Sequence, residues 1–319
     1  MKRDTVTVGK FFEMEAAALG LKLLAGGDGM DRVIREPTVN RPGLALSGFT
    51  QYFASKRIQV MGYVETTYLQ TLDEETRKER YATMFSYKIP CVVYSRGLPP
   101  DPMLLQAATK AGVPVFESPL ITMKFINLAT LALEMMFAPK GTEMGSMVDI
   151  LGVGVIVRGE SGIGKSECVL ALIERGYSLV SDDVVKITVI DGNQVVGTGD
   201  EIMREHMEVR GIGIINVASM FGVKSVRREK RLDLIVSLKA WEEVEDINRV
   251  GIDQETVKVL GVDVPHVVIP VRPGRDLARL VEVAAFQAKL KHSGHNPAED
   301  LNNRLIAKMA KDHAKREGK

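Results

Sequence analysis

The stretch GESGIGKS, from Gly159 to Ser166, has the residue types and spacing of a phosphate-binding loop, G-x-x-x-x-G-K-[ST]. In such a loop the backbone N–H groups converge on the anion, and the N-terminus of the following helix adds partial positive charge. Lys165 would contact the β- and γ-phosphates of a nucleotide, and the Ser166 hydroxyl would occupy one position on Mg²⁺. The pattern predicts a nucleotide site formed by Gly159, Glu160, Ser161, Gly162, Ile163, Gly164, Lys165 and Ser166.

Two adjacent acids, Asp182 and Asp183, follow the apolar residues LVS. We expect them at the carboxyl end of a strand, beside the loop in a parallel α/β sheet. There one carboxylate could hold Mg²⁺ or its water while the other receives a proton from an attacking hydroxyl. An acidic pair after a strand can also be an ordinary turn, and that interpretation remains open.

Two further segments could serve the same site. In MEVRGIGIINV, Glu208 could be a second metal ligand and two glycines could let the backbone approach a ligand, although a helix end running into a buried strand explains the same residues. In IPVRPGR, Arg272 and Arg275 flank a stiff Pro-Gly turn, and two guanidinium forks suit a phosphate. A solvated turn is the alternative there.

The elements that must position these residues can be read from periodicity. VDILGVGVIVRG is predicted to be one buried strand entering the loop, and ECVLALIERG a helix leaving it that ends at Gly176. YSLVSDDVVKITVI and VVGTG are predicted to be strands around a DGN turn, IMREHMEVR a short helix, and GIGIINV and LDLIVSL further strands. From Asp276 the pattern is mainly helical, with a break at HSGHNP.

Helical and strand-like segments also alternate in the first part of the chain, which predicts a small α/β domain. APKGTEMGS replaces periodicity with turn formers, so we place the junction near residue 135, between an N-terminal domain of residues 1–135 and a catalytic domain of residues 136–319. The apolar run ITMKFINLATLALEMMFA is interrupted by Lys124, Asn127 and Glu134, and it predicts a buried helix rather than a membrane span.

The composition is that of a soluble globular protein. The 319 residues are 45% hydrophobic and 26% charged, with a formal net charge of +1. This balance gives no global field that would attract nucleic acid or a membrane, so neither is expected as a partner. Cys91 and Cys168 lie in apolar runs and are expected to be buried thiols, and no secretory signal precedes them, so a cytoplasmic location is expected. The basic cluster VRREKR is expected to be a solvated loop, and Trp241 is expected to pack rather than to stack on a base.

Taken together, GESGIGKSE, LVSDDVV, EVRGIGIINV and IPVRPGR resemble the HPr kinase/phosphorylase family in their order along the chain. NRPGLALSGFTQYFASKRIQVMGYVE in the first domain also resembles it, so the likeness covers most of the chain. These bacterial enzymes phosphorylate a serine of the phosphocarrier protein HPr in carbon regulation and also remove that phosphate. The resemblance implies an α/β fold with a small N-terminal domain and a P-loop kinase domain of the phosphoenolpyruvate carboxykinase-like type. It further implies a homohexamer, Mg²⁺, and ATP or pyrophosphate as donor.

The resemblance also implies roles for individual residues. Asp183 would be the base that deprotonates the HPr serine and, in reverse, the acid that protonates it as phosphate attacks phosphoserine and pyrophosphate forms. Asp182 would assist through metal or water, Glu208 would be a further Mg²⁺ ligand, and Arg249 would stabilise charge on the transferring phosphoryl group. A segment used in both directions would comprise Met207, Glu208, Val209, Arg210, Gly211, Ile212, Gly213, Ile214, Ile215 and Asn216. A segment used mainly for dephosphorylation would comprise Pro270, Val271, Arg272, Pro273, Gly274 and Arg275.

One position departs from the family pattern. Where the family usually has a histidine before a glycine, this chain has Met144 before Gly145. A thioether is a weak acceptor and does not titrate near neutral pH, so the balance between kinase and phosphorylase activity is open. His206 could substitute for that histidine, although an exposed helix histidine is the expected interpretation.

Two other functions remain as alternatives. One is a nucleotide-sensing regulatory protein with impaired catalysis; the retained Lys165, Ser166, Asp183, Glu208 and Arg249 argue against it, because a sensor needs no base. The other is a P-loop kinase for a small metabolite, which the first domain and the full motif order disfavour.

Overall fold

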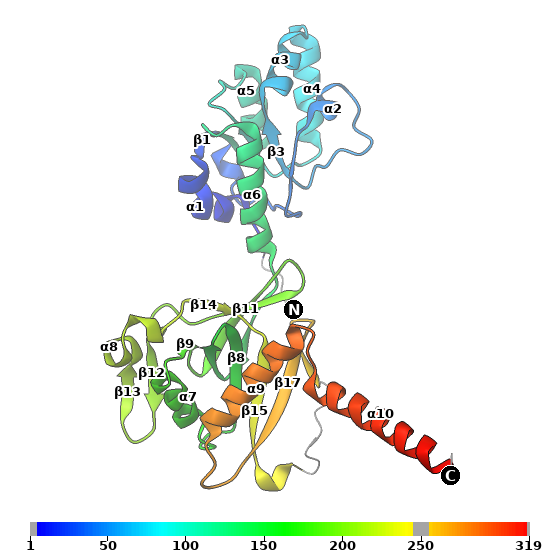
Figure 1. Cartoon of the computed structure of the whole chain (residues 1–319). Helices are drawn as coiled ribbons and strands as arrows, with labels where there is room; N and C mark the ends of the chain where they lie inside the picture. Colours follow the sequence, from blue (N-terminus) through cyan, green and yellow to red (C-terminus); the bar gives the residue numbers. More distant parts are fainter. Residues whose placement is uncertain (1–4, 245–254, 318–319) are drawn as a thin grey trace. The chain divides into compact units, whose positions relative to one another are not determined.

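The computed structural model describes residues 5–244 and 255–317. Contacts divide the chain into two compact units, Met1–Ala138 and Pro139–Lys319, and each is described by itself (Figure 1). Both units are mixed α/β. Within the residues that the structure describes, no helix is long and apolar enough to cross a membrane.

The N-terminal unit is a five-stranded sheet in the order β1-β5-β4-β3-β2. Strands β2 to β5 are parallel, and β1 pairs antiparallel with β5. One apolar cluster joins one face of the sheet to α1 and α6, and a second joins the other face to α4 and α5. The elements are α1 Val8–Leu19, β1 Lys22–Ala25, β2 Val39–Asn40, α2 Gly43–Leu46, β3 Ile58–Met61, α3 Tyr63–Gln70, α4 Glu74–Ser86, β4 Val92–Tyr94, α5 Pro102–Ala111, β5 Val115–Glu117 and α6 Thr122–Phe137.

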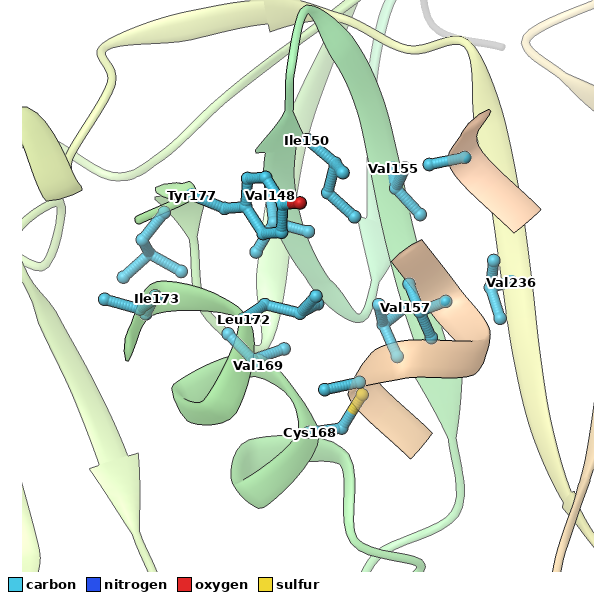
Figure 2. Packing of buried hydrophobic residues seen from close by; sticks show 14 of the residues in the cluster. Val148, Ile150, Val155, Val157, Cys168, Val169, Leu172, Ile173, Tyr177 and Val236 are labelled. Atoms are coloured by element: carbon cyan, nitrogen blue, oxygen red, sulfur yellow. The ribbon is translucent and has the colours of Figure 1, made fainter. Parts of the chain in front are cut away.

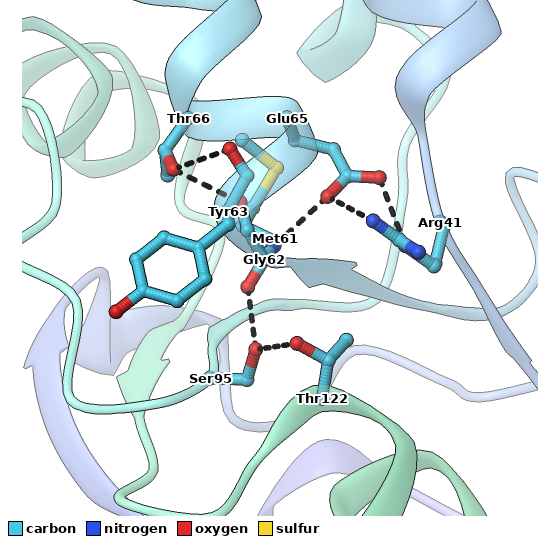
Figure 3. Close-up of polar contacts among 8 residues, drawn as sticks. All are labelled: Arg41, Met61, Gly62, Tyr63, Glu65, Thr66, Ser95 and Thr122. Atoms are coloured by element: carbon cyan, nitrogen blue, oxygen red, sulfur yellow. Dashed lines mark hydrogen bonds and ion pairs between the residues drawn. The ribbon is translucent and has the colours of Figure 1, made fainter.

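A buried polar cluster holds the carboxyl ends of β3 and β4 (Figure 3). Glu65 is 3% exposed; each of its oxygens accepts a hydrogen bond of 2.9 Å from Arg41, and one also accepts the Gly62 N–H at 3.0 Å. Ser95 donates to the Met61 carbonyl at 2.9 Å. A buried carboxylate is stable only when it is paired and hydrogen-bonded, so Arg41 and the start of α3 are fixed together.

The predicted buried helix is buried on one face only. Phe125, Ala129 and Leu133 of α6 are inaccessible, whereas Met123 and Leu131 are 61% and 59% exposed. The helix is thus buried along the face that meets the sheet of its own unit, while apolar residues on its other face are exposed.

The C-terminal unit is built on a six-stranded sheet in the order β16-β17-β15-β8-β7-β9. Helices α7 and α9 pack on one face through an apolar cluster that includes Val157, Val169 and Leu172 (Figure 2). A four-stranded sheet, β14-β11-β10-β6, is joined to this sheet through a second apolar cluster that includes Ile156 and Ile187. The bounds are β6 Lys140–Met144, β7 Ser146–Ile150, β8 Val153–Gly159, α7 Lys165–Glu174, β9 Ser178–Ser181, β10 Val184–Ile190, β11 Gln194–Thr198, β12 His206–Val209, β13 Gly213–Asn216, α8 Val217–Phe221, β14 Glu229–Arg231, β15 Leu234–Ala240, β16 Thr256–Val259, β17 Val262–Val271, α9 Leu277–His292 and α10 Pro297–Glu317.

Several predicted elements differ in this unit. The segment expected to be one strand is a hairpin, β7 and β8, which turns at Leu151 and Gly152, both of positive φ. The expected helix IMREHMEVR contains strand β12 instead, because its alternating residues Met207 and Val209 are buried. Part of the expected turn-rich junction forms β6, which pairs with β10. In each case pairing with a neighbouring strand outweighs the local sequence preference.

Strand directions explain how the loop and the acids meet. Strand β7 is antiparallel to both β8 and β9, so β8 and β9 run in the same direction and end at the same edge of the sheet. The sheet is therefore mixed rather than wholly parallel as expected. The phosphate loop follows β8, and Asp182 and Asp183 follow β9, so both lie at this edge.

The expectations for the two cysteines and for the basic cluster VRREKR had different outcomes. Cys91 and Cys168 are free, buried thiols, as predicted. The basic cluster is not simply solvated, because Arg227 and Lys230 lie 3.0 and 3.8 Å from the carboxylate of Asp149, which is 5% exposed.

We expect His266 to make the stability of the C-terminal unit depend on pH. Burial lowers the pKa of His266 below its ordinary value of 6.5; the neighbouring Glu255 opposes this shift, and Arg158 and Lys239 reinforce it. Its Nε2 lies 2.8 Å from the Ser237 hydroxyl. Because the folded state favours the neutral ring, the unfolded chain binds a proton more readily just below pH 6.5, so the free energy of unfolding should rise with pH through that window and level off above it. Urea unfolding at a series of pH values, followed by Trp241 emission, measures this slope.

His266→Asn should reduce the slope, whereas the exposed His292→Asn serves as the control and should keep it. Equal slopes in the wild-type protein and in His266→Asn would contradict the assignment.

Candidate active site

The predicted phosphate loop lies between β8 and α7, and α7 begins at Lys165. Gly164 precedes the helix with φ 99° and Gly162 has φ 89°, backbone conformations that favour glycine. Gly164, the residue before α7, makes no side-chain hydrogen bond to its first turn. The first N–H groups of α7 present the positive end of the helix to the loop.

The loop forms one wall of a cavity of about 240 Å³. Residues from three separate parts of the chain line it: the loop with the start of α7, the turn after β9, and the strand β12 with its following turn. They are Glu160, Ser161, Gly162, Gly164, Lys165, Ser166, Glu167, Asp183, Glu208 and Arg210. The structure therefore brings together the loop, one of the two acids and part of the MEVRGIGIIN segment.

A larger cavity, of about 810 Å³, lies near the start of β8, away from the loop. Charged side chains on its wall already have partners within the protein: Arg231 is 2.7 Å from Asp233, and Lys289 donates to the Leu151 carbonyl at 2.8 Å. The smaller cavity is the better candidate, because polar groups converge on it from separate elements.

Lys165 and Asp183 form the central contact of the smaller cavity. The Lys165 Nζ atom lies 2.8 Å from the Asp183 Oδ1 atom. The Asp183 side chain is 55% exposed and that of Lys165 is 19% exposed. Asp183 also has φ 56°, a conformation uncommon outside glycine, which turns the chain sharply between β9 and β10. The phosphate-contacting cation and the predicted base are therefore direct neighbours.

Asp182 faces the protein rather than the cavity. Its Oδ1 accepts from the Ser146 hydroxyl at 2.6 Å, and its Oδ2 accepts from the Glu208 N–H at 3.1 Å. Burial raises the pKa of Asp182, and these two hydrogen bonds oppose the rise. This carboxylate thus ties β7 to β12 beside Asp183. No local pattern indicates the partnership with Ser146, because 36 residues separate the two side chains.

The MEVRGIGIIN segment is a β-hairpin formed by β12 and β13. Met207 and Val209 point into the core, and Glu208 lies on the opposite face, which lines the cavity. Arg210, at the turn, donates a hydrogen bond to the Ser161 hydroxyl of the loop. The exposed residues Ile212 and Ile214 are 73% and 66% accessible. Sequence reasoning placed Arg210 in the segment but did not find its contact with the loop, since 49 residues separate the partners.

His206 does not lie on an exposed helix as expected. It begins strand β12, is partly buried, and its Nε2 lies 3.2 Å from the Asn216 side-chain amide. Asn216 in turn caps α8 by accepting the Ser219 N–H at 2.7 Å. These contacts give His206 a structural role at the base of the hairpin.

The RPGR turn follows β17, whose last residues are Pro270 and Val271. Gly274, with φ 82°, follows Pro273 in the turn. Arg272 and Arg275 do not line the 240 Å³ cavity, and the turn leads directly into α9, which begins at Leu277.

The remaining predicted residues have the following positions. Met144, 69% exposed, ends β6 opposite Val184, and the next residue, Gly145, donates its N–H to the Asp183 carbonyl at 2.8 Å. The departure from the family pattern is therefore adjacent to the predicted base. Arg249 lies outside the described residues.

The donor set of the cavity suits a magnesium ion carried by a nucleotide. Ser166, Asp183 and Glu208 all contribute oxygen atoms to the lining, and oxygen is the ligand type that Mg²⁺ prefers. Within residues 5–244 and 255–317, no three His, Cys, Asp or Glu side chains cluster closely enough to form a self-sufficient metal site. Mg²⁺ commonly takes one or two protein ligands and completes its shell with phosphates and water, so the residues present fit that mode of binding.

Comparison with known proteins identifies relatives for both units. Residues 6–133 match the family model "HPr Serine kinase N terminus", and residues 135–305 match "HPr Serine kinase C-terminal domain". The chain is 40% identical to the HPr kinase/phosphorylase of Chloroherpeton thalassium over 97% of this chain and 92% of that protein. It is 41% identical to the HPr kinase/phosphorylase of Geobacter sulfurreducens over 91% of each chain. Among solved structures, the Hpr(Ser) kinase/phosphatase from Coxiella burnetii is 32% identical, with a TM-score of 0.46 over 52% of this chain and 98% of that one.

Proposed function

Because this chain belongs to the HPr kinase/phosphorylase family, we propose that it phosphorylates a serine of the phosphocarrier protein HPr and also removes that phosphate by phosphorolysis. The observation that carries the proposal is the 2.8 Å contact between Lys165 and Asp183 in the cavity beside the phosphate loop. A cation for the donor phosphates and a carboxylate for the acceptor hydroxyl are adjacent there. This is the requirement for transferring a phosphoryl group to an alcohol.

In the forward direction, the backbone N–H groups of the loop and Lys165 bind the terminal phosphates of the nucleotide. A phosphate oxygen competes with Asp183 for the Lys165 ammonium, which frees the carboxylate to accept the proton of the HPr serine hydroxyl. The serine oxygen forms a bond to the terminal phosphorus as the bond to the leaving ADP breaks. Arg249 is proposed to stabilise the charge on the transferring group, although it lies outside the described residues.

In the reverse direction, an oxygen of inorganic phosphate attacks the phosphorus of phosphoserine. The phosphorus–serine bond breaks, the serine oxygen takes a proton from Asp183, and pyrophosphate is formed. Asp183 thus acts as base in one direction and as acid in the other. The RPGR turn, with its two arginines, is proposed to serve mainly this reaction.

Other residues hold these groups in place. Arg210, bonded to Ser161, fixes the outer part of the loop. Asp182, which accepts from Ser146 and from the Glu208 N–H, sets the position of β12 and hence of the Glu208 side chain. Ser166 and Glu208 are proposed to hold Mg²⁺. When bound with nucleotide, Mg²⁺ would supply positive charge that offsets the negative charge developing on the phosphates.

We also propose ATP as the donor with pyrophosphate as a second one, a homohexamer as the assembly, and the cytoplasm as the location. The surface offers apolar area that a neighbouring subunit could cover: Leu131 of α6 is 59% exposed, and Leu301 and Ile306 of α10 are 59% and 56% exposed. Exposed apolar surface of this kind commonly marks a protein interface.

The decisive experiment is to incubate the protein with HPr, Mg²⁺ and labelled ATP, and then with inorganic phosphate in the same tube. Label should appear on an HPr serine and then leave as pyrophosphate. Asp183→Asn should slow transfer by about 100- to 10,000-fold, the usual contribution of a general base, because an amide cannot accept the proton. Nucleotide binding, measured by calorimetry, should change little, because the loop supplies most contacts with the phosphates.

Each alternative gives a different result in this experiment. Binding of ATP without transfer at any Mg²⁺ concentration would indicate a nucleotide sensor, and transfer to a small metabolite in preference to HPr would indicate a metabolite kinase. Normal transfer by Asp183→Asn would remove the base assignment.

Met144→His should favour phosphorolysis. The new imidazole would be one residue from the Gly145 N–H that bonds to Asp183, so it could supply the titrating group that this chain lacks. Pyrophosphate release from phosphorylated HPr should rise by about tenfold or more, with a smaller change in ATP-dependent transfer. Met144→Leu, which cannot titrate, is the matched control. Equal rates in the histidine and leucine variants would show that the missing histidine does not limit the reaction.

A further inference from the structure

Glu143 of strand β6 points into the space between the two sheets of the C-terminal unit. Exposed and partly buried residues alternate along β6, and Glu143 is on the partly buried side. Its register partner on β10 is Val185, which is inaccessible and belongs to the apolar cluster between the sheets. A carboxylate in such a place is stable only when it is paired. Its partner is Arg158 of β8, whose guanidinium donates a hydrogen bond to Glu143.

The Glu143–Arg158 pair joins two sheets rather than two neighbouring strands. Its side chains are only 23% and 25% exposed, so water screens the pair less than it screens a surface ion pair. Glu143 belongs to the four-stranded sheet and Arg158 to the six-stranded one. Arg158 also directly precedes Gly159, the first residue of the phosphate loop. The pair therefore connects β6 to the strand that leads into the loop.

The side chains of β6 do not fix the register of this strand by hydrophobicity. Met144, the neighbour of Glu143, is apolar but 69% exposed. A slip by one residue would exchange the two faces of the strand, so Met144 would enter the space between the sheets and Glu143 would reach solvent. At these two positions, burial of apolar surface favours the slipped arrangement. The bond to Arg158 opposes it, because the slip would separate the guanidinium from its carboxylate.

The register of β6 determines what supports the predicted base. Gly145, which follows β6, donates its N–H to the Asp183 carbonyl at 2.8 Å. Gly145 also lies directly against β8: a Cβ atom there would be 2.7 Å from the Val157 carbonyl oxygen and 3.2 Å from the Arg158 Cγ atom. Asp183 has φ 56°, a conformation that surrounding contacts must hold. A slip would remove the glycine from the place where no side chain fits, and with it the bond to Asp183.

From this arrangement we propose that Glu143 and Arg158 are positioning residues for the reaction: their ion pair fixes the register of β6 against β8 and thereby holds Asp183 beside the phosphate loop. Neither residue lines the cavity, so both act through the backbone of Asp183. This inference rests on the proposed function. It explains a charged pair between the sheets, because such a pair seldom adds stability over apolar residues of similar volume but can select one arrangement among several.

The test replaces the pair by apolar residues of similar size, in the double variant Glu143→Leu/Arg158→Met. No charge is then left unpaired, so the urea midpoint of unfolding should equal or exceed that of the wild-type protein. The kcat should nevertheless fall by about ten- to a hundred-fold in both HPr phosphorylation and phosphorolysis, the loss expected when a reacting group moves by about 1 Å. The KM for ATP should change by less than about twofold, because the loop and Lys165 are intact.

Two further variants isolate the charge of the pair. Arg158→Lys keeps a cation that can reach Glu143, and its kcat should stay within about threefold of the wild-type value. Lys186→Met is the matched control, because it removes an exposed ion pair with Asp200 from strand β10 of the same sheet. Its kcat should remain within about twofold of the wild-type value.

The Asp183→Asn background separates positioning of the base from a general structural role. Once the base is absent, replacing the pair as well should lower the residual transfer rate by less than about twofold, because the two changes affect the same group. A further loss of about tenfold in that background would overturn the proposal. A kcat near the wild-type value in the double variant, or a loss of kcat accompanied by a lower unfolding midpoint, would also overturn it.

Failure of the proposed function has a separate signature. In that case the wild-type protein would transfer no phosphoryl group to HPr, whereas the Gly145 amide would still report the register of β6. Hydrogen exchange of peptides that contain Gly145, measured by mass spectrometry, should be faster in the double variant, because the bond to the Asp183 carbonyl is lost. Unchanged exchange would show that the ion pair does not fix the strand.

Discussion

The contact between Lys165 and Asp183 is the interaction on which the rest of the site depends. An ammonium next to a carboxylate is satisfied electrostatically, so neither group needs another partner while the cavity holds only water. A phosphate with two or more negative charges is a stronger ligand for the same ammonium, because its oxygens are also bound by the N–H groups of the loop. Arrival of the donor would thereby release the carboxylate. One pair of charges could thus couple donor binding to the availability of the base.

The six-stranded sheet supplies what this contact requires, which is two strand ends at one edge. The phosphate loop follows β8, and the two acids follow β9. These strands run in the same direction on either side of β7. The separation between them is therefore set by hydrogen-bond register rather than by flexible connections. Asp182 adds a side-chain link between strands, because it accepts hydrogen bonds from Ser146 on β7 and from the Glu208 N–H on β12. Burial raises the pKa of Asp182, and the two donors oppose that rise while they tie the carboxylate to these segments.

Much of this arrangement could be predicted, and the failures have physical causes. The loop, the helix after it, the acid pair and the α/β class depend on local spacing, which the sequence records directly. The helix expected at IMREHMEVR is strand β12, and the single strand expected before the loop is the hairpin β7–β8. Both errors arose at hairpins, where pairing with the next strand along the chain outweighs the local preference for a helix or for one long strand. Contacts such as Arg210 with Ser161 were missed for a different reason, because they join residues far apart in the chain.

The two motif segments outside the loop are placed differently with respect to the cavity, and this difference supports separate roles. The β12–β13 hairpin contributes Glu208 and Arg210 to the cavity itself, so a residue there can act whenever the phosphates are bound. The RPGR turn does not line the cavity, is anchored to α7 and α9 through Asp276, and places Arg272 over the ring of Trp241. In phosphorolysis the attacking phosphate takes the place of the donor's leaving phosphate, because the attacking and leaving oxygens lie in line with the transferred phosphorus. Both directions therefore share the cavity beside the loop, and the RPGR turn can act on them only from outside it.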